Sequence, residues 1–493
     1  MSASPLPILT IGDPRLEERA WEVTAWDAAL AGQLASLHAT LDDFRRRRGF
    51  GRALAAPQAG ILRRAIAMNL GAGPVSLLNP SITWRSDDEF AVWDDCLSIP
   101  GRVVRVKRNC SISLTYQDEQ GRLRNWRRLP PDLAELMQHE IDHLDGILMT
   151  RRAWGPDAVR PIEEHAQLVG AGRPKPQLSL DRIAAASCSI DPVFRDTPQY
   201  ECEPLSAILG CRLTLKVETV NPIRSFKGRG AAFFLQQAAA RGDTRPLVCG
   251  SAGNWGQALA WAARAQGRPL VVYAAANASP LKVERMRAFG AEVRLEGSDF
   301  DAAKDAARRC AEATGAWMVE DGLEPEISEG AGSIAVELLR GGAVFDAILV
   351  PLGNGALLNG IARWVKAASP ATRVIGVCAE GAPAMRESFL RGEPVSHETV
   401  DTIADGIAVR VPIPEAVSDM RGMVDEVRLV PDRHIVHAMK LLYRQAGLLV
   451  EPAGAAGLAA LLDAGSEFHD APVATVICGG NLAHEQASRW LFE

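Results

Sequence analysis

The sequence predicts a two-domain chain, with an α+β domain in residues 1–166 and an α/β domain with parallel sheets in residues 179–493. Three observations lead to this prediction. A chain of 493 residues is too long for one ordinary domain. Its first part combines helical periodicity with the alternation of half-buried strands, whereas its second part alternates short apolar runs with helical segments. Between the two, residues 167–178 are rich in glycine and proline, which is typical of a linker.

The composition limits the class of protein. An apolar content of 47% and a charged content of 23% are those of a globular protein. No apolar run is long enough to cross a bilayer, and the N-terminus lacks the regions of a signal peptide. The formal charge of −6 argues against a general nucleic-acid binder, and the 9 scattered cysteines without CxxC pairs argue against a disulfide framework. We therefore expect a cytoplasmic protein with no nucleic-acid or membrane partner.

The first domain is predicted to begin with a strand and a long helix. Residues 7–23 are expected to form a short strand and then an irregular segment with a turn at Gly12-Asp13-Pro14. A helix is predicted over residues 24–48, because leucines recur there at three- and four-residue spacing. These leucines are Leu30, Leu34, Leu37 and Leu41. The arginines at positions 45–48 suit the negative end of a helix dipole better than an anionic docking patch.

Further strands and a second helix are predicted later in this domain. An apolar strand is expected at residues 65–70. The alternation in residues 103–116 predicts half-buried antiparallel strands, with a turn at residues 118–122. Residues 132–148 are predicted to be helical, and they contain His139-Glu140-Ile141-Asp142-His143.

This His-Glu-x-x-His segment predicts a metal site. Residues four apart share one face of a helix, so His139 and His143 can present ring nitrogens to the same ion. Glu140 can act as a base on water at that ion. Cys96 can supply a third ligand, which leaves one open position on a tetrahedral metal. The alternative is two histidines on a helix surface, which the presence of Cys96 disfavours.

Three stretches of this domain resemble the motifs of peptide deformylases. Residues 51–58 (Gly-Arg-Ala-Leu-Ala-Ala-Pro-Gln) resemble motif I (GxGLAAPQ), residues 95–98 (Asp-Cys-Leu-Ser) resemble motif II (EGCLS), and residues 139–143 match motif III (HExDH). The resemblance covers roughly residues 5–155, with the motifs in the family's order and spacing. It implies an α+β metal hydrolase that acts on an N-formyl peptide or an N-formyl amino acid.

The same resemblance implies roles for individual residues. The ligands of ferrous iron or zinc would be Cys96, His139 and His143. Glu140 would be the general acid/base of the hydrolysis. The Gln58 side chain and the backbone amide of Leu97 would hydrogen-bond the developing oxyanion.

Two departures from the deformylase pattern concern the substrate more than the chemistry. Ala53 replaces the second glycine of motif I, and its Cβ is expected to narrow the cleft. Asp94-Asp95 replaces the Glu-Gly pair before the cysteine, so the backbone freedom of a glycine is lost there.

The second domain alternates predicted strands and helices. Strands are predicted at residues 246–249, 269–275, 291–295, 347–350, 374–377 and 473–477. Helices are predicted at residues 257–265, 281–289 and 299–313. This alternation predicts parallel sheets covered by helices, with a site at the carboxyl ends of the strands.

Loops with functional character follow several of these strands. Residues 251–254 (Ser-Ala-Gly-Asn) open a helix, so their amides can receive a substrate carboxylate. Residues 353–357 (Gly-Asn-Gly-Ala-Leu) can surround a phosphate with backbone amides, although an ordinary tight turn would have a similar sequence. Leu358 breaks a GxGxxG pattern, so a nicotinamide site is not expected. Cys478 follows the last strand, where a free core cysteine is the alternative.

Lys227 lies in the stretch Ser225-Phe226-Lys227-Gly228-Arg229-Gly230. A lysine amine can hold a cofactor aldehyde as an imine and later move protons, whereas the alternative is a solvated loop lysine. The stretch resembles the Schiff-base lysine motif of fold-type II pyridoxal-phosphate enzymes, which have a tryptophan synthase beta-like fold. The nearest branch is that of threonine and serine dehydratases. Its further motifs are matched in order over roughly residues 190–485, by residues 251–257, 330–333, 405–410 and 451–455.

This second resemblance implies pyridoxal 5′-phosphate as the cofactor. Lys227 would carry the cofactor and move the α-proton, and Asn254 would hydrogen-bond the cofactor 3′-oxygen. The phosphate would be held by Gly353, Asn354, Gly355, Ala356 and Leu357. Cys478 would face the pyridine nitrogen, where a neutral thiol cannot stabilise a positive ring as a carboxylate does. Such a thiol suits β-elimination, because the leaving group departs early.

The resemblance also implies how the amino-acid substrate is held. Ser251, with Ala252 and Gly253, would bind its carboxylate. Trp255 stands where dehydratases usually have histidine, and Asn354 and Ala356 interrupt the glycine run. These departures concern the side chain and leaving group of the substrate more than the cofactor.

The two resemblances together predict a bifunctional enzyme. Its first domain would deformylate an N-formyl amine or peptide, and its second would eliminate ammonia from a hydroxy amino acid such as threonine or serine. An N-formyl amide cannot react with the cofactor, so the first domain could unmask a substrate for the second. One alternative is a β-replacement synthase similar to cysteine synthase, and another is a deformylase-like domain that serves only as a binding module. Relatives of the second domain are commonly dimers, so a homodimer through this domain is expected.

Overall fold

The structure is a computed structural model that describes residues 4–164, 168, 178–251, 253–298 and 300–492. The chain divides into two compact units, built mainly on residues 1–176 and 177–493. Most of the predicted linker, residues 167–178, lies outside the described residues, so its boundaries stay predictions. Within the described part of the chain, no helix is long and apolar enough to cross a membrane.

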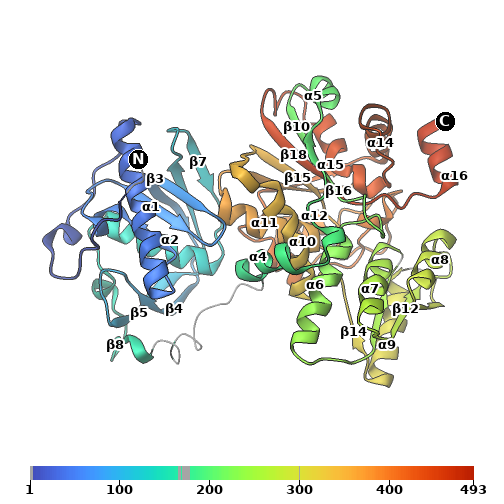
Figure 1. The fold of residues 1–493 in the computed structure, drawn as a ribbon, viewed down its shortest axis with the longest axis horizontal. Helices are drawn as coiled ribbons and strands as arrows, with labels where there is room; N and C mark the ends of the chain where they lie inside the picture. Colours follow the sequence, from blue (N-terminus) through green and yellow to red (C-terminus); the bar gives the residue numbers. More distant parts are fainter. Residues whose placement is uncertain (1–3, 165–167, 169–177, 252, 299, 493) are drawn as a thin grey trace. The chain divides into compact units, whose positions relative to one another are not determined.

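The first unit contains two long helices and two small sheets (Figure 1). Its helices and strands are α1 (Ala28–Arg48), β1 (Ala53–Ala55), β2 (Ala65–Asn69), β3 (Pro74–Arg85), β4 (Glu89–Asp95), β5 (Arg102–Asn109), β6 (Ile112–Gln117), β7 (Leu123–Trp126), α2 (Pro131–Leu144) and β8 (Val159–Pro161). One sheet has the order β1-β2-β3-β6-β7 and the other the order β4-β5-β8, and all their pairings are antiparallel. The α+β class predicted for this unit is therefore observed.

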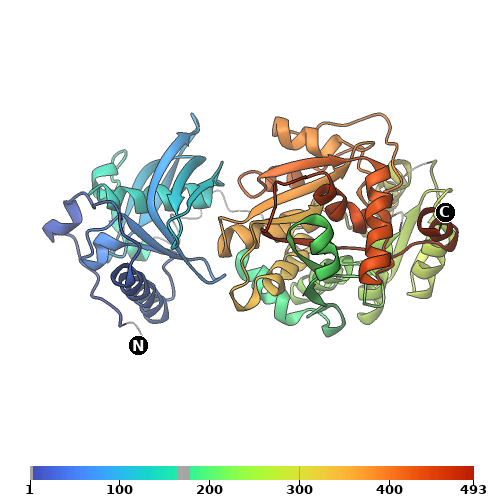
Figure 2. The same cartoon turned by 90° about the horizontal axis from the view of Figure 1, so that it is seen from above.

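Helix α1 forms where the leucine spacing predicts it. Asp27 caps its N-terminus by accepting a hydrogen bond from the Leu30 amide, and Gly49 ends it with a left-handed φ of 78°. The predicted leucines of α1 are all buried, and the helix packs on the β1–β2–β3 part of the sheet (Figure 2).

Two predictions for the first unit were wrong in detail. Residues 7–23 contain no strand. The Leu9 amide donates to Gln58 O and the Ile11 amide donates to Ser98 O, so this extended stretch hydrogen-bonds to two different segments and does not pair with a single neighbouring strand. Helix α2 ends at Leu144 and does not continue to residue 148, because Gly146 has a φ of 73° and turns the chain away.

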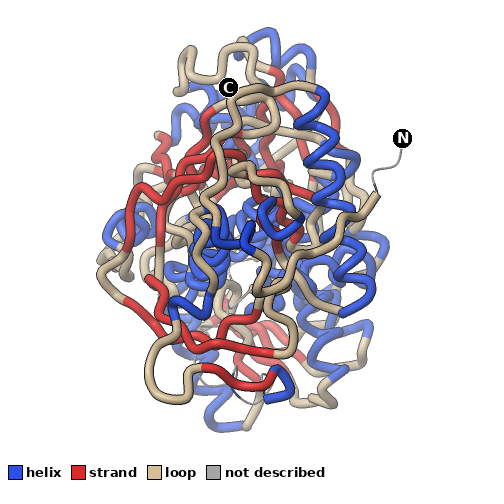
Figure 3. The backbone as a smooth tube through the Cα atoms, turned by 90° about the vertical axis from the view of Figure 1, so that its left-hand side faces the viewer, coloured by secondary structure: helices blue, strands red, loops and turns tan. Residues whose placement is uncertain are grey.

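The second unit is built on two sheets covered by helices (Figure 1), and Figure 3 distinguishes the helices from the strands along the whole backbone by colour. Its helices are α4 (Leu180–Ser189), α5 (Glu203–Leu209), α6 (Lys227–Ala240), α7 (Asn254–Ala265), α8 (Pro280–Ala288), α9 (Phe300–Thr314), α10 (Pro325–Leu338), α11 (Ala356–Ala368), α12 (Ala384–Arg391), α13 (Pro414–Asp419), α14 (Asp432–Ala446), α15 (Pro452–Leu462) and α16 (His484–Ala487). Its strands are β9 (Gln199–Glu201), β10 (Arg212–Val217), β11 (Leu247–Gly250), β12 (Leu270–Ala274), β13 (Glu292–Leu295), β14 (Trp317–Met318), β15 (Ala347–Pro351), β16 (Arg373–Ala379), β17 (Glu426–Val430) and β18 (Pro472–Ile477).

The two sheets are parallel except at one edge. The larger sheet has the order β17-β16-β15-β18-β10-β9, with only β9 antiparallel, and the smaller has the order β13-β12-β11-β14. Each strand and helix predicted in this unit is observed within a few residues of its expected bounds, although Asp299, the first residue of one predicted helix, is outside the described residues. The parallel α/β architecture predicted from the alternation is therefore confirmed.

A buried ionic cluster joins α6 to the larger sheet and to α10. Arg229 is fully buried and donates to both carboxylate oxygens of Glu218, which follows β10, at 2.8 and 2.9 Å, and to those of Glu337 on α10 at 2.7 and 2.9 Å. Lys216 Nζ donates to the same Glu337 at 2.6 Å. Burial alone would raise the pKa of Glu337, but hydrogen bonds from Arg229 lower it to about 2. Glu337 is therefore ionised beside Arg229, and the cluster fixes the start of α6.

We expect Arg229→Met to destabilise the second unit by about 3–5 kcal/mol, because it leaves Glu218 and Glu337 buried without their cation. The midpoint of thermal unfolding should fall by several degrees. Arg340→Met is the matched control, since Arg340 pairs with Asp196 at 2.6 Å on the surface and its loss should change the midpoint little. Equal midpoints for the two variants would contradict a structural role for the cluster.

Candidate active sites

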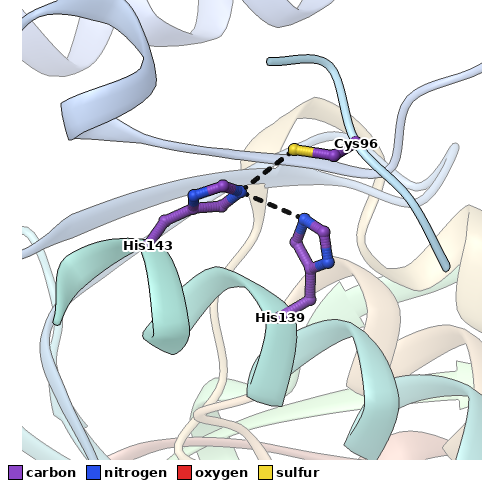
Figure 4. Close-up of side chains that lie close together, drawn as sticks. All are labelled: Cys96, His139 and His143. Atoms are coloured by element: carbon purple, nitrogen blue, oxygen red, sulfur yellow. Dashed lines mark hydrogen bonds between the residues drawn. The ribbon is translucent and has the colours of Figure 1, made fainter. Parts of the chain in front are cut away.

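The predicted metal ligands of the first unit lie together. Cys96 follows β4, and His139 and His143 lie one turn apart on α2 (Figure 4). Cys96 Sγ is 3.2 Å from His143 Nε2, which is 3.1 Å from His139 Nε2. All three side chains are buried, and their ligand atoms lie within 4.8 Å of one another.

The geometry of this cluster fits a tetrahedral metal ion. Bond lengths of about 2.0–2.3 Å to nitrogen and sulfur at tetrahedral angles place ligand atoms roughly 3.3–3.7 Å apart. Two observed separations, of 3.1 and 3.2 Å, are slightly shorter than this, and the third is within 4.8 Å, so adjustment of the side chains would let the three atoms enclose one ion. Two imidazoles and one thiolate suit zinc or ferrous iron, and three protein ligands leave a position for substrate or water.

Charged residues behind the ligands fix the orientation of the rings. Asp94 Oδ2 lies 2.8 Å from His139 Nδ1, so a proton on Nδ1 leaves Nε2 free to face an ion. Arg108 bridges Asp94 at 3.0 Å and Asp142 at 2.5 Å. Although burial would raise the pKa of Asp94, His139 and Arg108 hold it well below its usual range. The sequence pattern marked Asp94 only as a departure, and its orienting role becomes visible once β4 is placed beside α2.

The other predicted residues of this unit surround the same cluster. Gln58 is buried, and its Nε2 donates to Ser98 Oγ at 3.2 Å and lies 3.6 Å from Cys96 Sγ. Leu97 follows Cys96 directly in the turn after β4. Glu140 is buried, and burial raises its pKa to about 7 against the opposing charge of His139. A carboxyl group with such a pKa can exchange protons near neutrality.

In the second unit, Lys227 begins α6 beside the carboxyl end of β18. The Phe226 amide donates to Cys478 O at 3.0 Å, and Ser225 forms a β-bridge with Gly479. The Lys227 side chain is 17% exposed, and its Nζ forms an ion pair with Asp321. The lysine is therefore a largely buried group at the strand ends and not a solvated loop residue.

Asn254, the first residue of α7, is held in place by two neighbours. Its Nδ2 donates to Glu451 Oε1 at 2.5 Å, and its Oδ1 accepts from Asn481 Nδ2 at 2.8 Å. One hydrogen of its amide remains for another acceptor. Burial raises the pKa of Glu451 to about 7, opposed by the charge of Lys282. The sequence pattern assigned no role to Glu451, because its contact with Asn254 joins residues far apart in the chain.

Ser251 organises the loop before α7. Its Oγ accepts from the amides of Gly253 at 3.0 Å and Gly256 at 2.8 Å, so the hydroxyl hydrogen is free to donate to a ligand. Ala252 lies outside the described residues, and its predicted role stays a prediction.

The glycine-rich loop of residues 353–357 joins β15 to α11. A Cβ at position 353 would lie 2.8 Å from Gly406 O, and Gly355 has a φ of 97° that other residues rarely adopt. Ala356 and Leu357 form the first turn of α11, whose unpaired amides provide anion-binding donors. The loop therefore has the close backbone approach that a phosphate cradle needs.

Several predicted residues line one cavity of about 420 Å³, namely Lys227, Ser251, Gly253, Asn254 and Asn354. A cavity of this size accommodates a small cofactor with an amino acid. Cys478 is buried outside this lining, and its Sγ lies 3.7 Å from Ala453 O. Burial raises the pKa of the Cys478 thiol, so the group is neutral. The lining also includes Asp321, which the sequence pattern did not indicate.

The comparisons with known proteins agree with two separate sites. Residues 190–479 match the family of pyridoxal-phosphate dependent enzymes. The chain belongs to this family. Residues 5–158 match the polypeptide deformylase family, so the predicted joining of a deformylase-like domain to a pyridoxal-phosphate-dependent enzyme is confirmed.

Individual relatives match the second unit of this pyridoxal-phosphate-dependent enzyme. The L-threonine ammonia-lyase of Thermotoga maritima is 34% identical over 305 residues, which cover 62% of this chain and 76% of that protein. A Mycobacterium leprae protein described as L-threonine dehydratase biosynthetic IlvA is 36% identical over 315 residues, covering 62% and 73%.

Solved structures show the same fold. Maize serine racemase has a TM-score of 0.60 at 28% identity, covering 64% of this chain and 96% of that chain. The processed form of threonine deaminase isoform 2 from Solanum lycopersicum has a TM-score of 0.59 at 27% identity, covering 64% and 89%. The predicted fold-type II architecture is therefore confirmed.

Proposed function

We propose that the second unit deaminates a β-hydroxy amino acid, such as L-threonine or L-serine, by β-elimination. The observation that supports this most is the convergence of Lys227, Ser251 and Asn254 on one cavity, in a chain related to threonine ammonia-lyases. Bound pyridoxal phosphate would supply an electron sink for the charge that develops at the substrate Cα.

The residues of this cavity and those around it would have distinct tasks in the proposed reaction. The amides of residues 353–357 would hold the cofactor phosphate, and Asn254 would donate its remaining amide hydrogen to the ring hydroxyl oxygen. Ser251 would donate its hydroxyl hydrogen to the substrate carboxylate. Lys227 Nζ would anchor the cofactor and then accept the α-proton. Cys478, which lies outside the cavity lining, would offer the ring nitrogen only a neutral thiol and no anionic partner.

We expect Lys227→Ala to lower oxo-acid release from L-threonine and L-serine by at least about 10²–10⁴-fold, because it removes the group that takes the α-proton. Lys440→Ala on α14, outside the cavity lining, is the control and should retain full activity. A β-replacement synthase would instead give new amino acids when a thiol is added. Oxo-acid release that survives Lys227→Ala would contradict the proposal.

We further propose that the first unit is a metal-dependent deformylase. Cys96, His139 and His143 would bind zinc or ferrous iron, which would supply Lewis-acid activation of water. Glu140 would exchange the protons of the hydrolysis, while Gln58 and the Leu97 amide would stabilise the oxyanion. The proposed substrate is an N-formyl amino acid or peptide, whose freed α-amine the second unit requires. The predicted homodimer, which no contact in a single chain tests, stays a prediction.

We expect Asp94→Asn to weaken metal affinity by about 10–100-fold, since the amide no longer holds the His139 ring as a carboxylate does. Competition with a chelator measures this loss. Glu89→Gln on the same strand is the matched control, because Glu89 pairs with Lys107 on the surface at 3.6 Å and lies outside the ligand cluster.

The same two variants test the proposed substrate. With N-formyl-L-serine, wild type and Glu89→Gln should release formate and then ammonia, whereas Asp94→Asn should release less of both at a limiting metal concentration. Full metal loading without formate release from N-formyl amino acids or peptides would leave the unit a binding module and contradict the proposal.

A further inference from the structure

Asp321 is a buried carboxylate in contact with Lys227. Asp321 follows β14 at the carboxyl end of the smaller sheet. Two residues before it, the Val319 amide donates to Val248 O of β11 at 2.9 Å. Its side chain is 7% exposed and lines the cavity. Oδ2 pairs with Lys227 Nζ, and Oδ1 has no hydrogen-bond partner among the described residues.

The turn that carries Asp321 is tightly packed. Gly322 has a φ of 100°, and a Cβ at this position would lie 2.4 Å from Asn354 O of the phosphate loop. The Leu323 amide closes the turn by donating to Glu320 O at 3.2 Å. The Asp321 carboxylate is therefore held between the proposed phosphate loop and Lys227 by backbone that cannot easily move.

Asp321 differs from the other acidic residues that line the cavity in the cation with which it forms an ion pair. Those residues pair with cations that the proposed reaction does not use: Glu320 with Lys304 and Arg308, Asp301 with Arg410, and Asp405 with Lys282. The cation that contacts Asp321 is Lys227 Nζ, the nitrogen proposed to anchor the cofactor. Once that nitrogen is engaged, a buried carboxylate without a partner is costly, unless it shares or takes up a proton.

We propose that Asp321 is a second proton-transferring residue, which relays a proton from Lys227 Nζ to the leaving β-hydroxyl of the substrate. This inference rests on the proposed β-elimination. Lys227 and Asp321 thus act as a pair, in which the lysine takes the proton from Cα and the carboxyl group gives a proton to the leaving group.

The relay balances in protons and electrons. The Cα–H bond breaks, and Lys227 Nζ takes the proton. The Cβ–O bond breaks with its electron pair on oxygen. Asp321, which has taken the proton of its ion pair with Lys227 Nζ and so left that nitrogen a neutral amine, gives the oxygen a proton, and water leaves. Asp321 then regains a proton from the Lys227 ammonium, which returns both groups to their starting states.

Comparing two leaving groups in Asp321→Asn tests the relay. A hydroxyl needs a proton to leave and a chloride does not, so kcat for L-serine should fall by about 10²–10⁴-fold, while kcat for β-chloro-L-alanine should fall less than about fivefold. Equal losses on both substrates would mean a structural role and overturn the proposal. A raised KM for L-serine with unchanged kcat would mean a binding role and also overturn it.

A second readout needs no turnover. The absorbance of the bound cofactor, titrated with pH in the absence of substrate, reports the proton on the Lys227 nitrogen. Asp321→Asn should lower the midpoint by at least about one pH unit, because a carboxylate within contact distance stabilises that proton. Asp301→Asn removes a carboxylate from the same cavity lining and should leave the midpoint unchanged.

The other charged groups facing this site remain in both variants, namely Glu451, Lys282 with Asp405, and Glu320 with Lys304. An unchanged midpoint in Asp321→Asn would overturn the pairing of the two residues. A wild-type protein inactive on both substrates would count against the β-elimination itself, and the titration would still decide whether Asp321 acts on the Lys227 nitrogen.

Discussion

The buried pairing of Arg229 with Glu218 and Glu337 fixes the part of the structure on which the proposed lyase site depends. Arg229 lies two residues after Lys227, and its partners are Glu218, directly after β10, and Glu337 on α10. Because the cluster is fully desolvated, any displacement of α6 would separate charges in a medium that cannot replace their partners. The start of α6 is therefore held rigidly against the larger sheet, and the lysine amine enters the cavity from a fixed point.

In both candidate sites, a carboxylate from another segment of the chain orients a side chain of the site. In the first unit Asp94 orients His139, and Arg108 holds that carboxylate in turn. In the second unit Glu451 holds Asn254. Such supporting groups reduce the freedom of the side chains that would touch metal, cofactor or substrate, so the reacting atoms need less reorganisation.

The sequence predicted those features that depend on local pattern. The leucine spacing of α1, the alternating strand segments and the motifs around Cys96, His139 and Lys227 are all visible within a few residues. Features set by distant segments could not be found in this way. The strand before Asp321 has only 2 residues, and the partner of Asp321 lies 94 positions away, so neither its element nor its contact leaves a local signal. The strand predicted within residues 7–23 is absent for the same reason, because hydrogen bonds to the distant residues Gln58 and Ser98 set the path of this segment.

The proposed elimination requires Lys227 to be the residue that carries the cofactor. Borohydride reduction of the cofactor-loaded protein, followed by peptide mass spectrometry, tests this claim directly, because reduction makes the link between lysine and cofactor permanent. We expect a phosphopyridoxyl group on the peptide that contains Lys227. A group on Lys282 or Lys304, which line the same cavity, or on no lysine at all, would contradict it.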